Sequence, residues 1–108
     1  FYNINSKNNF YKTMTRAQIA AKISDATGLS KKETEIVVEG FISCIIECLK
    51  ENGNIEIRGF GTFKNNVKEP RTARNPRTGE SITLGKRYIP MFKVSKEFKK
   101  AVQDALVQ

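Results

Sequence analysis

The sequence predicts an α+β fold with two N-terminal helices, a three-stranded antiparallel sheet that extends into a β-ribbon arm, and a C-terminal helix. Three observations predict it. Two capped stretches with helical spacing of apolar residues fill the first half of the chain. A strand-like alternation at 55–58 then leads into a long basic segment, where prolines at 70 and 76 exclude a helix. A last helical pattern closes the chain.

Its 108 residues predict a single domain, and without the arm only roughly 70 residues remain for a core. A body of that size is marginally stable alone, so we expect an oligomer. Residues 1–13 contain no acid and show no helical or strand period, whereas Met14 directly precedes a helix start. We therefore expect a disordered N-terminal extension, 1–13, before a domain at 14–108 whose arm covers about 64–87.

The first helix is predicted to begin after Thr15, which forms a capping box with Gln18 three residues later. Apolar residues at helical spacing continue to about Thr27, and Gly28 is the expected left-handed terminator. A second capping box, Ser30 with Glu33, begins the next helix. So short a connection predicts that the two helices fold back as a hairpin.

The second helix is predicted to run to about Asn52, with Gly53 ending it. Its apolar residues cover more than one face, and they are Ile36, Val37, Val38, Phe41, Ile42, Cys44, Ile45, Ile46, Cys48 and Leu49. One short neighbouring helix cannot cover so broad a surface. The pattern favours a position buried between two subunits.

The sheet begins at Ile55–Arg58, and the glycines on either side of Phe60 indicate tight turns. The outgoing strand of the arm follows, with its tip near 74–79 and a returning strand through 82–84. Residues 88–92 bring the chain back to the core, where Phe60 and Phe63 are expected to pack. Ser95 is predicted to cap a final helix over 96–107.

The net charge of +8 is concentrated in the arm. Residues 64–93 contain eight basic and two acidic residues, whereas residues 15–53 contain five basic and six acidic ones. Large apolar side chains are almost missing from 64–81, so this segment cannot bury enough surface to fold on itself. The concentration predicts a polyanionic partner, a nucleic acid or an anionic membrane. The segment lacks the apolar face of an interfacial helix, which argues against the membrane.

The sequence gives little support for a catalytic site or a metal site. There is no histidine, the commonest general base and metal ligand. Cys44 and Cys48, four residues apart, supply two ligands at most, and we expect them to be small buried hydrophobes. No stretch has the length of a transmembrane helix. We expect no enzyme activity, catalytic residue, cofactor, metal site, membrane contact or small-molecule substrate.

Three motifs resemble the HU/IHF family of bacterial histone-like DNA-bending proteins. They are Ile55-Glu56-Ile57-Arg58-Gly59-Phe60-Gly61-Thr62-Phe63, Arg74-Asn75-Pro76-Arg77-Thr78-Gly79-Glu80 and Ile89-Pro90-Met91-Phe92-Lys93. They occur in order, behind two capped helices, and the likeness spans about 15–102. Two stretches depart from the family's usual pattern, and two others point to one branch of it. Ala73 replaces a common glycine, Val94-Ser95-Lys96 replaces Pro-Gly-Lys, and both Glu56-Ile57-Arg58 and Gly85-Lys86-Arg87-Tyr88 are similar to the integration host factor β subunit.

The resemblance implies an intertwined dimer, a homodimer or a heterodimer, with a helical body below a saddle of strands. Two arms would reach around double-stranded DNA and lie in its minor groove, and Pro76 at each tip would wedge between base pairs and bend the duplex. The implied role is compaction of the bacterial nucleoid with little sequence specificity. A site-preferring subunit similar to integration host factor is the alternative, and a plastid or similar organelle stays open as the location.

The expected DNA contacts are Arg16, Arg58, Lys64, Lys68, Arg71, Arg74, Asn75, Pro76, Arg77, Thr78, Lys86, Arg87 and Lys93. Among them Arg16, Lys64, Lys68, Lys86 and Lys93 are expected to contact phosphate. Glu56 and Arg58 either take part in site recognition, as the resemblance implies, or form a solvated strand face.

Two other classes of function fit the sequence less well. An RNA- or single-strand-binding module needs exposed aromatic side chains for stacking, and the arm has none between Lys64 and Arg87. A metal-dependent nuclease needs paired carboxylates, but Asp25, Glu56, Glu80 and Asp104 lie in different predicted elements.

Overall fold

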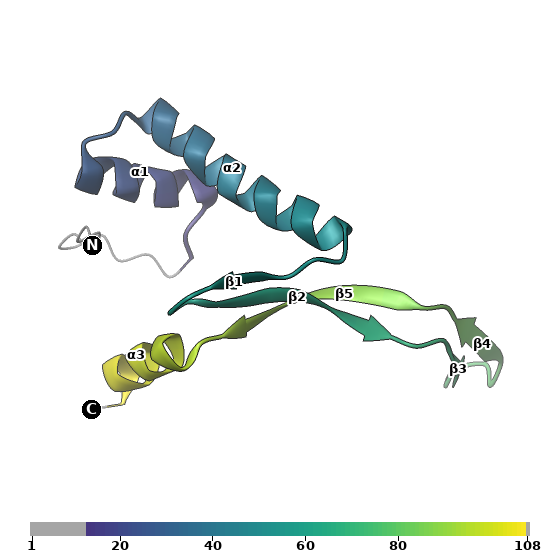
Figure 1. The fold of residues 1–108 in the computed structure, drawn as a ribbon. Coiled ribbons are helices and arrows are strands. Elements are labelled where there is room, and N and C mark those ends of the chain that lie inside the picture. The colour runs from purple at the N-terminus through teal and green to yellow at the C-terminus, as the bar shows by residue number, and fades with distance from the viewer. Residues whose placement is uncertain (1–12, 108) are drawn as a thin grey trace. The chain divides into compact units, whose positions relative to one another are not determined.

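The computed structural model describes residues 13–107, and its chain divides into two compact units at the Cys44–Ile45 boundary. Figure 1 shows the elements, whose bounds are α1 (Arg16–Thr27), α2 (Lys31–Lys50), β1 (Ile55–Ile57), β2 (Gly61–Lys68), β3 (Arg71–Arg74), β4 (Ser81–Leu84), β5 (Arg87–Val94) and α3 (Lys96–Leu106). The predicted order of helices and strands is confirmed. The expected disorder of 1–13 concerns residues that, apart from Thr13, lie outside the described part of the chain.

The first unit contains α1 and the N-terminal part of α2. Both predicted capping boxes are present: Gln18 N donates to Thr15 Oγ1 at 3.2 Å, and Glu33 N donates to Ser30 Oγ at 3.1 Å. Gly28 adopts φ 80°, as expected of a left-handed terminator. Ala20, Ser24 and Thr34 are buried in this unit.

The C-terminal end of α2 differs from the prediction by two residues. The helix ends at Lys50, and Asn52, not a glycine, adopts the left-handed conformation with φ 58°. Gly53 N donates to Cys48 O at 2.9 Å and Asn52 N donates to Leu49 O at 3.0 Å, which together form a Schellman motif. Gly53 is needed for another reason, because a Cβ there would lie 2.8 Å from Cys48 Sγ.

The second unit is built on an antiparallel sheet with strand order β1-β2-β5, beyond which β3 and β4 form a separate hairpin. Figure 1 shows this hairpin continuing the β2–β5 ribbon, with α3 following β5 at the other end. Gly61 pairs with Val94 and Lys68 pairs with Arg87 at the two ends of the inner ladder. Ser95 Oγ accepts from Phe98 N at 3.0 Å and caps α3 as predicted.

Four phenylalanines cluster on one face of this sheet. The ring centroids of Phe63 and Phe92 are 4.6 Å apart, and those of Phe60 and Phe98 are 5.4 Å apart. Gly61 allows this close packing, because a Cβ at that position would lie 2.6 Å from the Phe92 ring. The expected packing of Phe60 and Phe63 is confirmed, although Phe60 remains 37% exposed in the single chain.

The single chain buries little apolar surface. Among the described residues, only Ala20 and Leu49 are buried hydrophobic residues. Several apolar residues of α2 that were expected to be covered are open, with Val37 65% and Phe41 49% exposed. Cys44 is also exposed, so its predicted burial is wrong for the isolated chain, because no other element among the described residues covers it. Cys48, also predicted to be buried, is half-buried.

Candidate nucleic-acid interface

The inner ribbon places four cationic side chains on one face of the sheet. Side chains alternate between the two faces along a strand, and residues paired across strands share a face. Lys64 and Lys68 of β2 therefore share a face with Arg87 and Lys93 of β5, through the pairs Lys68↔Arg87 and Thr62↔Lys93. All four are exposed. This face also carries Ile89 and Met91, whereas the opposite face carries Phe63 and Phe92 and no charged residue, so the cations of the inner ribbon all lie on one side.

The ribbon is not a continuous ladder. Its inner part ends at Lys68↔Arg87 and its outer part begins at Arg71↔Leu84. Pro70, which has no backbone donor, lies in this break, and Lys86 lies in the break on the returning side. Lys86 Nζ lies 5.6 Å from the centre of the Tyr88 ring. The sequence predicted the arm but not this interruption.

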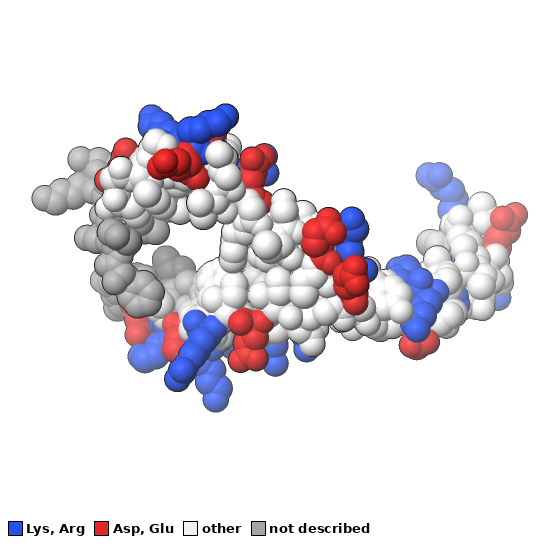
Figure 2. All heavy atoms as spheres, turned by 45° about the horizontal axis from the view of Figure 1, so that its top comes forward, with Lys and Arg blue, Asp and Glu red and all other residues white. Residues whose placement is uncertain are grey.

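The outer hairpin carries arginines on both of its faces. Arg71 and Arg74 are three residues apart in β3 and therefore point to opposite sides. Both are exposed. Figure 2 shows basic side chains along the ribbon at the right of the view, with a few acidic ones among them. A narrow hairpin with cations on two sides suits a groove whose two walls are both negative.

The tip is held by hydrogen bonds around Pro76. Asn75 Oδ1 accepts from Arg77 N at 2.9 Å, which makes an Asx turn with the proline at its centre. Asn75 N donates to Glu80 O at 2.8 Å, and Gly79, with φ 78°, reverses the chain. The Thr78 hydroxyl accepts from Glu80 N at 3.3 Å. Pro76 itself is exposed, so a fixed apolar ring faces outward at the end of the arm.

Glu56 and Arg58 lie two residues apart beside a shallow hollow of about 400 Å³, which Thr62, Lys93 and Lys96 also line. Both side chains are exposed. Glu56 and Thr62 are paired across β1 and β2, and Thr62 pairs in turn with Lys93. This hollow thus borders the same basic face and carries two carboxylates, Glu56 and Glu97, among three cations.

Arg16 is the one predicted contact in the first unit. It begins α1, and its guanidinium lies 3.8 Å from the Glu39 carboxylate of α2. The Arg16 side chain is 57% exposed, so this ion pair is a weak surface contact. The second unit contains the other twelve predicted contacts.

Sequence reasoning missed Asn65. It lies on the apolar face of β2, between Phe63 and Val67, and its amide Nδ2 donates to Leu49 O at 2.8 Å. The available signal was that Asn65, a polar residue, stands at an inward position of a strand whose neighbouring inward residues are apolar. The described residues contain no group of three or more His, Cys, Asp or Glu that could hold a metal ion. None of the described helices is long and apolar enough to span a bilayer.

Comparison with known proteins gives the family. Residues 14–103 match the family described as bacterial DNA-binding protein. This chain belongs to that family. The resemblance to HU/IHF proteins is therefore confirmed, and with it the class of architectural DNA-binding proteins. Integration host factor subunit β of Teredinibacter turnerae is 38% identical over 94 residues, which cover 86% of this chain and 96% of the relative. The corresponding subunit of Colwellia psychrerythraea is 39% identical over 90 residues, or 82% of this chain and 95% of the relative.

Solved structures agree with the fold. A cocrystal structure of Anabaena HU with DNA superimposes with a TM-score of 0.74 at 25% identity, over 82% of this chain and 97% of that one. An HU mutant from Thermotoga maritima gives a TM-score of 0.62 at 22% identity, over 82% and 99% of the two chains. The predicted α+β fold with a β-ribbon arm is confirmed.

Proposed function

We propose that the protein is an architectural DNA-binding protein that bends double-stranded DNA, acting as a dimer with its two arms in the minor groove. The tip carries this proposal, because its Asx turn presents Pro76 as a rigid, exposed apolar ring between Arg74 and Arg77. A ring of this kind can occupy the space between two unstacked base pairs without needing a hydrogen-bond partner. The arginines beside it would occupy the negative minor groove.

The remaining cations are arranged for phosphate contact. Lys64, Lys68, Arg87 and Lys93 form one exposed face, and Lys86 lies in the break beside it. Because charge neutralisation along the backbone carries no sequence information, these residues would hold a duplex without reading it. Unstacking costs a few kcal/mol per step, which the phosphate contacts of a wrapped duplex would offset.

Dimerisation follows from the open apolar surface. Phe41 and Ile36 of α2 are 49% and 59% exposed, and Val102 of α3 is 45% exposed. A chain with so small a core does not fold stably by itself, and a second copy is the partner that the family resemblance implies. Either a homodimer or a heterodimer meets this requirement. We place the protein in the bacterial nucleoid, or in an organelle such as a plastid, and assign it no catalytic role.

Compaction with little sequence specificity is the principal role that we propose, and a site-preferring role is the second candidate. Glu56 and Arg58, exposed at the edge of the basic face, favour the second candidate, as does the identity to integration host factor β subunits. A carboxylate among cations can reject some base edges as well as accept others, which pure phosphate contact cannot do.

The test is the affinity and end-to-end fluorescence transfer of a duplex of about 35 base pairs, a length chosen to span both proposed kinks. We expect binding to shorten the distance between the ends and to weaken steeply with added salt. A single-stranded DNA or RNA of equal length should compete poorly. Binding without shortening would refute the bending function, and equal competition by a single strand would favour the RNA- or single-strand-binding class.

A further inference from the structure

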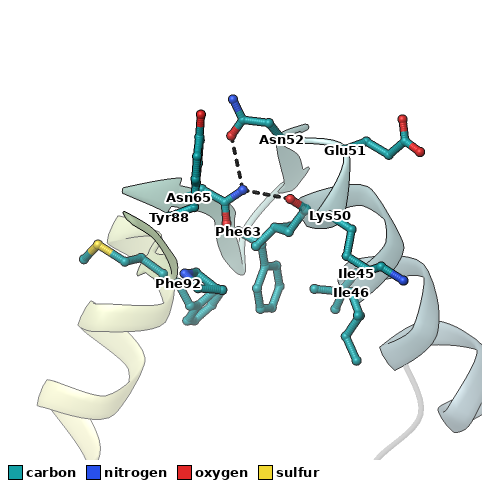
Figure 3. A pocket seen from close by; sticks show the side chains of 12 residues that line it. Ile45, Ile46, Lys50, Glu51, Asn52, Phe63, Asn65, Tyr88 and Phe92 are labelled. Atoms are coloured by element: carbon teal, nitrogen blue, oxygen red, sulfur yellow. Dashed lines mark hydrogen bonds between the residues drawn. The ribbon is translucent and has the colours of Figure 1, made fainter. Parts of the chain in front are cut away.

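Asn65 joins the base of the arm to the last turn of α2. Its side-chain amide donates to Leu49 O at 2.8 Å and to Asn52 Oδ1 at 3.2 Å. Figure 3 shows both bonds reaching from the strand to the end of the helix. One planar amide therefore serves two acceptors on a segment more than ten residues away in sequence.

The acceptor side of this joint is itself fixed. Leu49 O also receives Asn52 N at 3.0 Å, and Asn52 is held in the left-handed conformation with φ 58°. The carbonyl groups at the end of a helix lack intrahelical donors and carry partial negative charge, so an amide donor from outside the helix is favourable there. Leu49 is 9% exposed, which limits the competition from water for its carbonyl.

Packing around the joint provides little orientation by itself. Beside Asn65 lies an open, largely apolar cavity of about 790 Å³, lined among others by Phe63, Tyr88 and Phe92 (Figure 3). Apolar contact is non-directional, whereas two hydrogen bonds from one amide fix both distance and orientation. Pro90, the residue paired with Asn65 across the ladder, has no N–H to contribute.

We propose that Asn65 is a positioning residue for DNA bending. By tying β2 to the end of α2, it fixes the direction in which the ribbon leaves the sheet, three residues before the inner ladder ends at Lys68. A duplex bent by the two arms exerts a restoring force on them, and the arms transmit this force to the joint. If the joint is loosened, the arms change direction and the DNA straightens. The inference rests on the proposed bending function.

The experiment compares Asn65→Leu, which keeps similar volume but has no donor, with Asn66→Ala as its matched control. Asn66 lies on the opposite face of the same strand and makes no side-chain hydrogen bond within the described residues. Asn52→Gly serves as a milder second variant, because glycine keeps the left-handed conformation and removes one acceptor. Four readouts apply to each protein. They are hydrogen exchange of amides 64–68 without DNA, the ratio of affinities for linear and prebent duplex, the thermal midpoint, and end-to-end fluorescence transfer on the linear duplex.

We expect Asn65→Leu to speed exchange at the arm base and to lower the linear-to-prebent affinity ratio by roughly two- to tenfold per protomer, the factor that one hydrogen bond contributes to an equilibrium. Asn52→Gly should give a smaller change in the same direction, and Asn66→Ala should give none. A lower thermal midpoint with an unchanged affinity ratio would show a purely structural role and overturn the proposal. So would equal changes in Asn66→Ala. If the parent protein itself leaves the linear duplex straight, the proposed bending function is wrong. If the parent protein and Asn65→Leu bend the duplex equally, only the positioning role of Asn65 is wrong.

Discussion

Replacing Pro76 with alanine tests the wedge separately from the charges. The substitution leaves Arg74 and Arg77 in place, and it preserves the acceptor of the Asx turn, because Asn75 Oδ1 bonds to the backbone of Arg77. The tip should therefore keep its fold and its electrostatic attraction to DNA. What disappears is most of the apolar ring and the restraint that proline places on φ.

The expected loss can be estimated from the stacking that the ring would replace. Unstacking costs a few kcal/mol per step, and a methyl group fills only part of the opened space. We expect affinity for linear duplex to fall by about 1–3 kcal/mol, which corresponds to about 5- to 150-fold. Prebent or nicked duplex should be affected less, because its stacking is already broken.

The assay is end-to-end fluorescence transfer on a duplex of about 35 base pairs, with the protein in excess so that every duplex is bound. Pro70→Ala is the matched control, since it removes a proline from the break in the ladder and leaves the tip untouched. Pro76→Ala should lengthen the end-to-end distance, whereas Pro70→Ala should lengthen it much less. If Pro76→Ala bends the duplex as far as the parent protein does, the proline is only a turn former and the intercalation hypothesis is wrong.

Three further predictions concern charge, recognition and assembly. Lys86→Ala should weaken binding to all duplex sequences alike and flatten the slope of log affinity against log salt by about 0.9 per lost contact in each subunit; a changed sequence preference would contradict this. Arg58→Ala should lower the affinity for a preferred site more than the affinity for random duplex. An equal loss of affinity for the two duplexes would favour general binding. The thermal midpoint should rise with protein concentration, and Phe41→Ala should lower dimer stability by about 3–5 kcal/mol in denaturant titrations. A monomeric sedimentation mass with a concentration-independent midpoint would refute the dimer.

Features determined by neighbouring residues were predicted from the sequence. The capping boxes at Thr15 and Ser30 need only a partner three residues away, so both helix starts were correct. The end of α2 was less accurate, because asparagine adopts the left-handed conformation readily enough to end a helix before the glycine that follows. The exposure of Cys44 depends on whether another chain covers it, and one sequence does not contain that information.

The candidate site shows the same division. Composition identified the basic arm, and its prolines and the family motif identified the tip. The shared face of Lys64, Lys68 and Lys93 requires the strand register, which the tip turn determines. The break after Lys68 was not predicted, although Pro70 lies within it. Asn65 was missed because its acceptors are a backbone carbonyl and a side chain at the end of another element, and no periodicity encodes such a partner.

The length of the arm explains why the tip needs charges of its own. The inner ladder ends at Lys68, and β3 beyond it spans about 10 Å at the rise of about 3.3 Å per residue of a strand, so with the break before β3 the tip lies more than about 10 Å from that ladder. The screening length at 0.1 M salt is about 10 Å, so cations on the inner ribbon exert little attraction on phosphates near the tip. Arg74 and Arg77 are therefore the groups able to hold Pro76 against a base step, and an arm with those two charges removed should still bind the duplex through its base while bending it less.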